Sequence, residues 1–87
     1  MEIRKKATAG TMQSSDLMVT VEPAPQLSIT IESTVHKQYE HLIRAKIEEV
    51  LSCLGVSRGT IAITDRGALD YAIEARVEAA LRRSAEV

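Results

Sequence analysis

The hydrophobic period changes once along this chain, and that change constrains the fold more than any other feature. Apolar and polar residues alternate in residues 17–22 and again in residues 27–32, which is the period of a strand with one buried face. After Ser33 and Thr34, either of which could cap a helix, the apolar spacing becomes three and four. The resulting stripe is Val35, Tyr39, Leu42, Ile43, Ile47, Val50, Leu51 and Leu54. The pattern therefore predicts two strands followed by a helix.

The second half of the chain repeats this change in a shorter form. Gly55 followed by Val56 is typical of a C-terminal glycine cap with an apolar contact. Residues 60–64 predict a short strand, and residues 65–67 (Asp-Arg-Gly) predict a turn. The stripe of a second helix follows at Leu69, Ile73, Val77, Ala80 and Leu81. Residues 6–12 predict a weak edge strand at the other end of the chain.

These elements predict an α+β fold with the order (β)ββαβα. Residues 17–22 and 27–32, joined through Pro23-Ala24-Pro25, are expected to form an antiparallel hairpin. The segment 27–64 is expected to form a right-handed crossover. Two amphipathic helices can bury their stripes against one face of the sheet. We therefore expect residues 1–87 to form a single domain, a two-layer sandwich with a small, mostly antiparallel sheet.

Charge and cysteine content exclude several classes of protein. The net charge is −1, so the chain lacks the basic field that holds nucleic acid. Cys53 is the only cysteine, so no internal disulfide can form, and we expect it to be a buried, inert thiol. No apolar run reaches membrane-spanning length, and no apolar segment typical of a secretory signal follows the N-terminal basic residues. These features predict a cytoplasmic protein without a membrane partner.

The titratable residues do not form a recognisable catalytic or metal-binding pattern. His36 and His41 are five residues apart, so they do not share a helix face as a metal pair would, and we expect both on the helix surface. Asp65, Asp70 and Glu74 surround the start of the second helix, where acidic residues suit the helix dipole. We therefore expect no metal site and no catalytic dyad.

Residues 9–16 contain the segment that a core does not require. Gly10 relaxes the backbone there, and the polar residues 13–16 favour a solvated turn beside the strand that begins at Leu17. A Ser–His–acid hydrolase would need a histidine held against Ser14 or Ser15, and 87 residues leave little room for the pocket and oxyanion hole. A chain that is modified or bound by other proteins, without catalytic residues of its own, fits the sequence better.

Four segments together resemble the family of citrate lyase acyl carrier proteins (gamma chains). They are Ala9-Gly10-Thr11, Ser14-Ser15-Asp16, Asp65-Arg66-Gly67-Ala68-Leu69-Asp70 and Ala75-Arg76-Val77-Glu78-Ala79. The resemblance covers nearly the whole chain, and the pairing of A-G-T-x-x-S-x-D with a distant D-x-G-A-L-D is specific. Residues 65–70 are expected to be mainly architectural, with Leu69 opening the buried stripe and Arg66 exposed.

The resemblance implies a non-catalytic carrier whose serine holds a phosphoribosyl-dephospho-coenzyme A arm through a phosphodiester. Ser14 occupies the position of that serine, and Ser15 the next position, where the family often has glycine. Gln13 departs from the family's common glutamate, which removes a charge beside the site. Because adjacent residues of an extended segment point in opposite directions, a transferase that positions Ser14 would miss Ser15.

The implied partners are the citrate lyase alpha and beta subunits and a prosthetic-group transferase. In the family, the thioester on the arm exchanges acetyl for citryl in one subunit, and a second subunit cleaves the citryl thioester to oxaloacetate. The outer helix faces, or the serine side of the sheet, are expected to contact these subunits.

Three other kinds of protein remain as alternatives. The first is a carrier for citramalate lyase or malonate decarboxylase, and the second is an interaction subunit without a prosthetic group. The third is the helical phosphopantetheine carrier, in which an Asp-Ser-Leu motif starts a helix in an acidic bundle. Ser15-Asp16-Leu17 has the first two residues reversed and precedes a strand, which argues against that third class.

Overall fold

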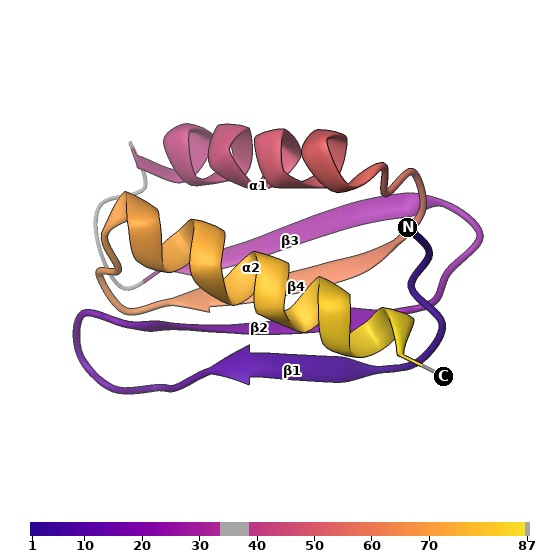
Figure 1. Cartoon of the computed structure of the whole chain (residues 1–87). Helices are drawn as coiled ribbons and strands as arrows, with labels where there is room; N and C mark the ends of the chain where they lie inside the picture. The colour runs from indigo at the N-terminus through magenta and orange to yellow at the C-terminus, as the bar shows by residue number, and fades with distance from the viewer. Residues whose placement is uncertain (34–38, 87) are drawn as a thin grey trace.

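A computed structural model of the chain describes residues 1–33 and 39–86, which form a four-stranded sheet and two helices. In chain order the elements are β1 (Ala7–Gly10), β2 (Leu17–Glu22), β3 (Leu27–Ser33), α1 (Glu40–Leu54), β4 (Gly59–Asp65) and α2 (Asp70–Ala85). Both helices lie on the same face of the sheet (Figure 1). The predicted α+β fold, a two-layer sandwich with the order βββαβα, is confirmed.

The order of strands in the sheet is β1-β2-β4-β3, which differs from the predicted hairpin. β4 lies between β2 and β3, pairing antiparallel with β2 and parallel with β3. The parallel pair confirms the crossover through α1, while the pairing of β2 with β3 was wrong. The two strands run in opposite directions, as expected, but residues 23–26 step across β4. Four extended residues span about 13 Å, and two strand spacings need only about 10 Å.

The true hairpin of the molecule is formed by β1 and β2, which pair antiparallel from Ala7 opposite Val21 to Gly10 opposite Met18. β1 confirms the predicted edge strand but is shorter than residues 6–12. The connection between the two strands contains the serine pair. The serine that the resemblance singles out therefore lies at the tip of this hairpin.

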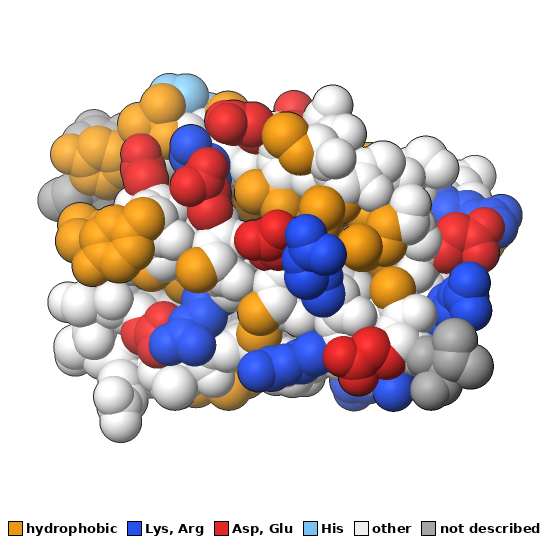
Figure 2. All heavy atoms as spheres, in the orientation of Figure 1, with side chains coloured by type: hydrophobic (Ala, Val, Ile, Leu, Met, Phe, Trp, Pro, Cys, Tyr) orange, Lys and Arg blue, Asp and Glu red, His pale blue; other side chains and the backbone are white. Residues whose placement is uncertain are grey.

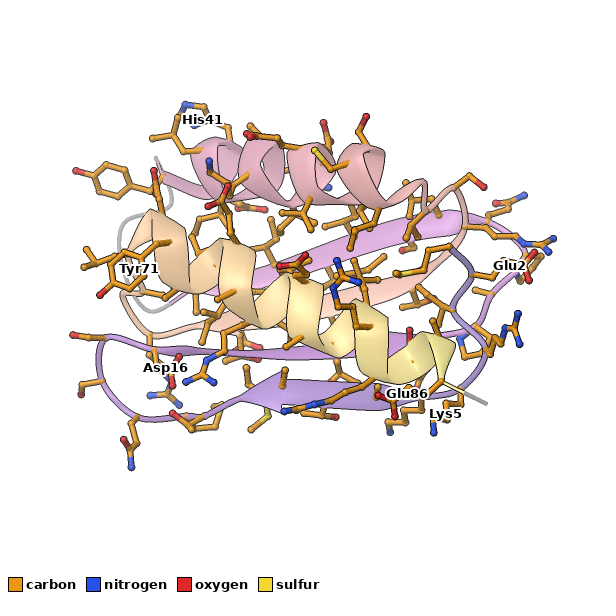
Figure 3. The ribbon with its side chains drawn as sticks, in the orientation of Figure 1. Glu2, Lys5, Asp16, His41, Tyr71 and Glu86 are labelled. Atoms are coloured by element: carbon orange, nitrogen blue, oxygen red, sulfur yellow. The ribbon has the colours of Figure 1, made fainter. Side chains whose placement is uncertain are left out.

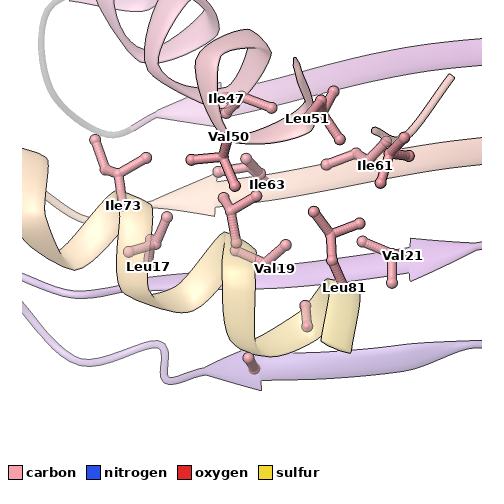
Figure 4. Close-up of a cluster of buried hydrophobic side chains, with 14 of the residues drawn as sticks. Leu17, Val19, Val21, Ile47, Val50, Leu51, Ile61, Ile63, Ile73 and Leu81 are labelled. Carbon is pink, nitrogen blue, oxygen red and sulfur yellow. The ribbon is translucent and has the colours of Figure 1, made fainter. Parts of the chain in front are cut away.

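The core lies between the sheet and the helices and is aliphatic (Figure 4). The inward positions of β2 and β4 are almost completely shielded from solvent, as their alternation predicts. The helices contribute the buried residues Ile43, Ile47, Val50, Leu51, Ile73, Val77, Ala80 and Leu81. Burial of these stripes fixes both helices on the sheet.

The end of α1 follows the prediction, whereas its start does not. Gly55 caps the helix in the left-handed conformation, with φ of 69°, and Val56 is buried. Ser33 is the last residue of β3 rather than a cap, and Tyr39 precedes the first helical residue without a side-chain cap bond. Tyr39 and Leu42 were predicted to be in the buried stripe, but both side chains are exposed. The predictions that concern Thr34, Val35 and His36 lie outside the described residues.

Candidate functional site

The serine pair lies in a tight turn at the tip of the β1–β2 hairpin. The amide of Asp16 donates to the carbonyl of Gln13 at 3.2 Å, so Ser14 and Ser15 are the two central residues of the turn. Ser15 has φ of 64°, the left-handed conformation that glycine adopts most easily. The segment is therefore a turn, whereas the choice between Ser14 and Ser15 from the sequence had assumed an extended segment. Its conformation itself explains why glycine suits position 15.

Gly10 holds the base of this turn close to the neighbouring strand. It has φ of 99°, and a Cβ atom at this position would overlap the carbonyl oxygen of Leu17. The amide of Thr11 donates to that same carbonyl at 3.1 Å. Glycine is therefore required at position 10 by both its conformation and this close approach.

The turn pairs with the segment that follows β4. The Ser15 amide donates to the Arg66 carbonyl at 2.8 Å, and the Arg66 amide donates to the Asp16 carbonyl at 2.9 Å. Two residues of one strand thus face one residue of the other, which is the hydrogen-bond pattern of a β-bulge with a left-handed first residue. This bulge joins two of the four segments that carried the resemblance, residues 14–16 and residues 65–70, although they are about fifty residues apart.

The Asp16 carboxylate fixes the turn from the helix side (Figure 3). It accepts hydrogen bonds from the Thr11 hydroxyl at 2.6 Å and from the Leu17 amide at 2.8 Å. Arg76 of α2 reaches the same carboxylate through Nε at 3.3 Å and Nη2 at 3.1 Å. The Thr11 and Leu17 bonds, followed by Arg76, lower the pKa of Asp16 to about 2. The carboxylate is therefore charged at neutral pH.

Arg76 belongs to this site although the sequence pattern did not predict it there. Arg76 precedes the buried Val77 and lies at the border of the apolar stripe of α2, which gave a weak signal. Its partner is sixty residues away in the sequence, and only the packing of α2 beside β1 and β2 brings the two together.

The Ser14 hydroxyl is exposed at the corner of this fixed turn. Within the described residues, neither a base nor any other polar group forms a hydrogen bond with it. His41 is exposed on α1, and His36 lies outside the described part of the chain. The arrangement presents a hydroxyl to another protein but supplies no visible means of activating it.

Residues 65–70 were expected to be mainly architectural, and Asp65 and Gly67 have such a role. The buried Asp65 accepts hydrogen bonds from the Ser33 hydroxyl at 3.0 Å and from the Ala68 amide at 2.9 Å, so it joins the end of β3 to the turn. Gly67 has φ of 90°, which confirms the predicted turn. Leu69, however, was wrongly predicted to be buried. It precedes α2 in an extended conformation and is 60% exposed.

Two further predictions concern metal sites and the thiol. In residues 1–33 and 39–86, no group of three or more potential ligands could hold a metal ion. Cys53 was predicted to be buried but is exposed, beside a hollow between α1 and α2 that Glu49, Glu74 and Glu78 also line. No helix in the described residues is long and apolar enough to cross a membrane.

Comparisons with known proteins agree on one family. Residues 4–84 match a family model described as the malonate decarboxylase delta subunit (MdcD), an acyl carrier protein. The citrate lyase acyl carrier protein of Pectobacterium carotovorum is 47% identical, over 99% of this chain and 91% of its own length. That of Streptococcus mutans is 46% identical, over 100% and 87%. A chain from a crystal structure of a Pseudomonas malonate decarboxylase hetero-tetramer in complex with malonate aligns with a TM-score of 0.80 and 25% identity, over 93% of this chain and 84% of that chain.

Proposed function

Because this chain belongs to the family of citrate lyase acyl carrier proteins, we propose that it is the non-catalytic carrier subunit of a citrate lyase complex. Ser14 is the attachment point of a phosphoribosyl-dephospho-coenzyme A arm, joined through a phosphodiester. The observation that carries this proposal is the exposed Ser14 hydroxyl, without a protein partner among the described residues, at the corner of a turn fixed on both sides.

The geometry around Ser14 fits a large covalent group. The hydroxyl lies at the tip of a hairpin, so an attached arm would extend away from the core rather than displace packed residues. The bulge with Arg66 and the ion pair between Asp16 and Arg76 hold the root of the arm at a defined place. A tethered arm requires an attachment residue whose backbone is held in place and whose hydroxyl is accessible.

The bound arm would supply a thiol that holds acetyl and citryl groups as thioesters. The protein contributes the tether and a stable body that partners can recognise. Tethering raises the effective concentration of the acyl group at two active sites without requiring tight binding to either. Neither role needs a catalytic residue in this chain.

Exposed apolar side chains near the serine turn support docking to larger subunits. Leu42 and Leu69 border a hollow that Gly67 and Ala68 also line, directly after the residue that pairs with Ser15. The labelled Tyr71 and Asp16 lie at the same end of the molecule (Figure 3). We assign this surface to contacts with the citrate lyase alpha and beta subunits, because both must receive an arm rooted at this end.

A carrier for malonate decarboxylase is the second candidate, since the family model and the solved structure carry that description. Identities of 47% and 46% to citrate lyase carriers, against 25% to the chain from the decarboxylase structure, favour citrate lyase.

Reconstitution of lyase activity tests the proposed function. The loaded chain should restore citrate cleavage when it is mixed with a citrate lyase complex depleted of its carrier, and it should show no turnover alone. Malonate decarboxylase depleted of its own carrier serves as the matched acceptor. Turnover by the isolated chain, or restoration of the decarboxylase alone, would refute the assignment.

A further inference from the structure

Within the described part of the chain, Arg66 is the cation at the serine end of the molecule that has no ion-pair partner. Among the described lysines and arginines, Lys6, Arg44, Lys46, Arg58, Arg76 and Arg82 form ion pairs with carboxylates, and Arg83 donates to the carbonyl of Thr8. Of those that remain, Arg4 and Lys5 precede β1, and Lys5 lies at the end of the molecule opposite Asp16 (Figure 3). Arg66 is exposed, and the described residues offer its guanidinium no partner.

The backbone places Arg66 directly beside the attachment point. Its amide and carbonyl bond to Asp16 and Ser15, the two residues that follow Ser14. These bonds lie at 2.8 and 2.9 Å, so the position of Arg66 relative to the turn is fixed. Its side chain is exposed, and no bond among the described residues holds it.

Charges of both signs lie around the turn, and among the described residues Arg66 is the cation there without a carboxylate partner. The Asp16 carboxylate pairs with Arg76, and the buried Asp65 accepts hydrogen bonds from Ser33 and Ala68. Asp70 begins α2 four residues after Arg66, where the start of a helix favours an acidic side chain. In Figure 2, a few red and blue side chains lie among orange and white ones at this end of the molecule.

We propose that the Arg66 guanidinium binds the phosphodiester that would join the arm to Ser14, an inference that rests on the proposed function. A guanidinium presents planar donors that match two oxygens of a phosphate group. The contact would direct the first bonds of the arm toward the segment after β4, and thus toward the hollow bordered by Leu42 and Leu69. Arg66 is then a positioning residue for the arm.

The test compares the apo and loaded chains by nuclear magnetic resonance, with attachment first verified by intact mass. In the loaded wild type, the Nε–H signal of Arg66 should shift relative to the apo chain and exchange more slowly with water. In loaded Arg66→Gln, the resonance of the phosphodiester phosphorus on Ser14 should move toward its position in the urea-unfolded loaded chain. Added salt should shift the wild-type resonance in the same direction, because an exposed pair is screened.

Two variants serve as matched controls. Arg82→Gln removes an exposed arginine from the outer face of α2 and should leave the phosphorus resonance unchanged. Arg66→Lys keeps the charge and should retain part of the shift. Both Arg66 variants should keep the wild-type thermal midpoint, because the bonds to the turn come from the backbone.

The outcomes separate this inference from the proposed function. A wild-type chain that gains no mass on Ser14 in the presence of the transferase overturns both. If the Arg66 Nε–H signal is the same in the apo and the correctly loaded wild type, and the phosphodiester phosphorus signal does not respond to Arg66→Gln, the role of Arg66 alone is overturned.

Discussion

Asp16 is the residue on which the geometry of the serine turn depends most. Its pKa is lowered to about 2 by the Thr11 hydroxyl, the Leu17 amide and Arg76, whereas the ordinary value is 3.8. Because the folded-state pKa lies below the unfolded one, Asp16 stabilises the fold above about pH 4, and this contribution is lost between pH 4 and pH 2.

We predict that Asp16→Asn lowers the thermal midpoint at pH 7 and makes it less sensitive to pH between 4 and 2. Melting curves of both proteins across this range measure the effect, with Asp70→Asn as the control for a carboxylate in the first turn of α2. Parallel pH profiles for wild type and Asp16→Asn would show that the network around Asp16 does not stabilise the fold.

Ser15 adopts a conformation that costs a non-glycine residue about 1–2 kcal/mol, while glycine loses about 0.5–1 kcal/mol through its greater freedom in the unfolded chain. Ser15→Gly should therefore leave the free energy of unfolding unchanged or raise it by up to about 1 kcal/mol. Urea unfolding measures this difference, and Ser15→Ala, which keeps a Cβ atom, is the matched variant. If Ser15→Gly lowers the free energy of unfolding and Ser15→Ala does not, the left-handed conformation assigned to Ser15 is contradicted.

At the scale of elements, periodicity predicted the described strands and helices other than β1, which was expected only as a weak edge strand, but it did not predict the neighbours of β3. Alternation in residues 27–32 identifies an inward face, with Ile29 and Ile31 packed against the core. Alternation carries no information about which strand lies next to β3 in the sheet. The crossover places β4 beside β3, where β2 was expected as the hairpin partner. The stripe also failed at Leu42 and Leu69 near the helix starts, because a helical pattern does not show where the covering layer ends.

The central position of β4 and the exposure of Leu69 lead to opposite predictions for two truncations. Ile63→Ala, in the inner face of β4, should destabilise the fold by about 2–5 kcal/mol. Leu69→Ala should change stability by no more than about 0.5 kcal/mol, because the side chain is largely exposed. Chemical denaturation measures both. Equal losses would mean that Leu69 belongs to the core after all.

At the scale of the whole molecule, the fold places the Ser14 hydroxyl at the tip of a hairpin, away from the packed core. The sequence predicted Ser14 only through the paired motifs, since composition does not distinguish it from Ser15. Nothing in the sequence alone could show that the two motifs meet, because their contact depends on β4 lying beside β2. The structure shows why the two motifs occur together. The backbone of Arg66 and the side chain of Arg76 each hold one side of the serine turn.

The most direct test is the mass of the chain after co-expression with its prosthetic-group transferase. Wild type, Ser14→Ala and Ser15→Gly are compared by intact mass, and the modified residue is located by peptide mapping. The account predicts the same added mass on Ser14 in wild type and Ser15→Gly. It predicts none in Ser14→Ala, whose thermal midpoint stays close to that of the wild type because the side chain is exposed. Added mass on Ser14→Ala, or a modification mapped to Ser15, would contradict the central claim.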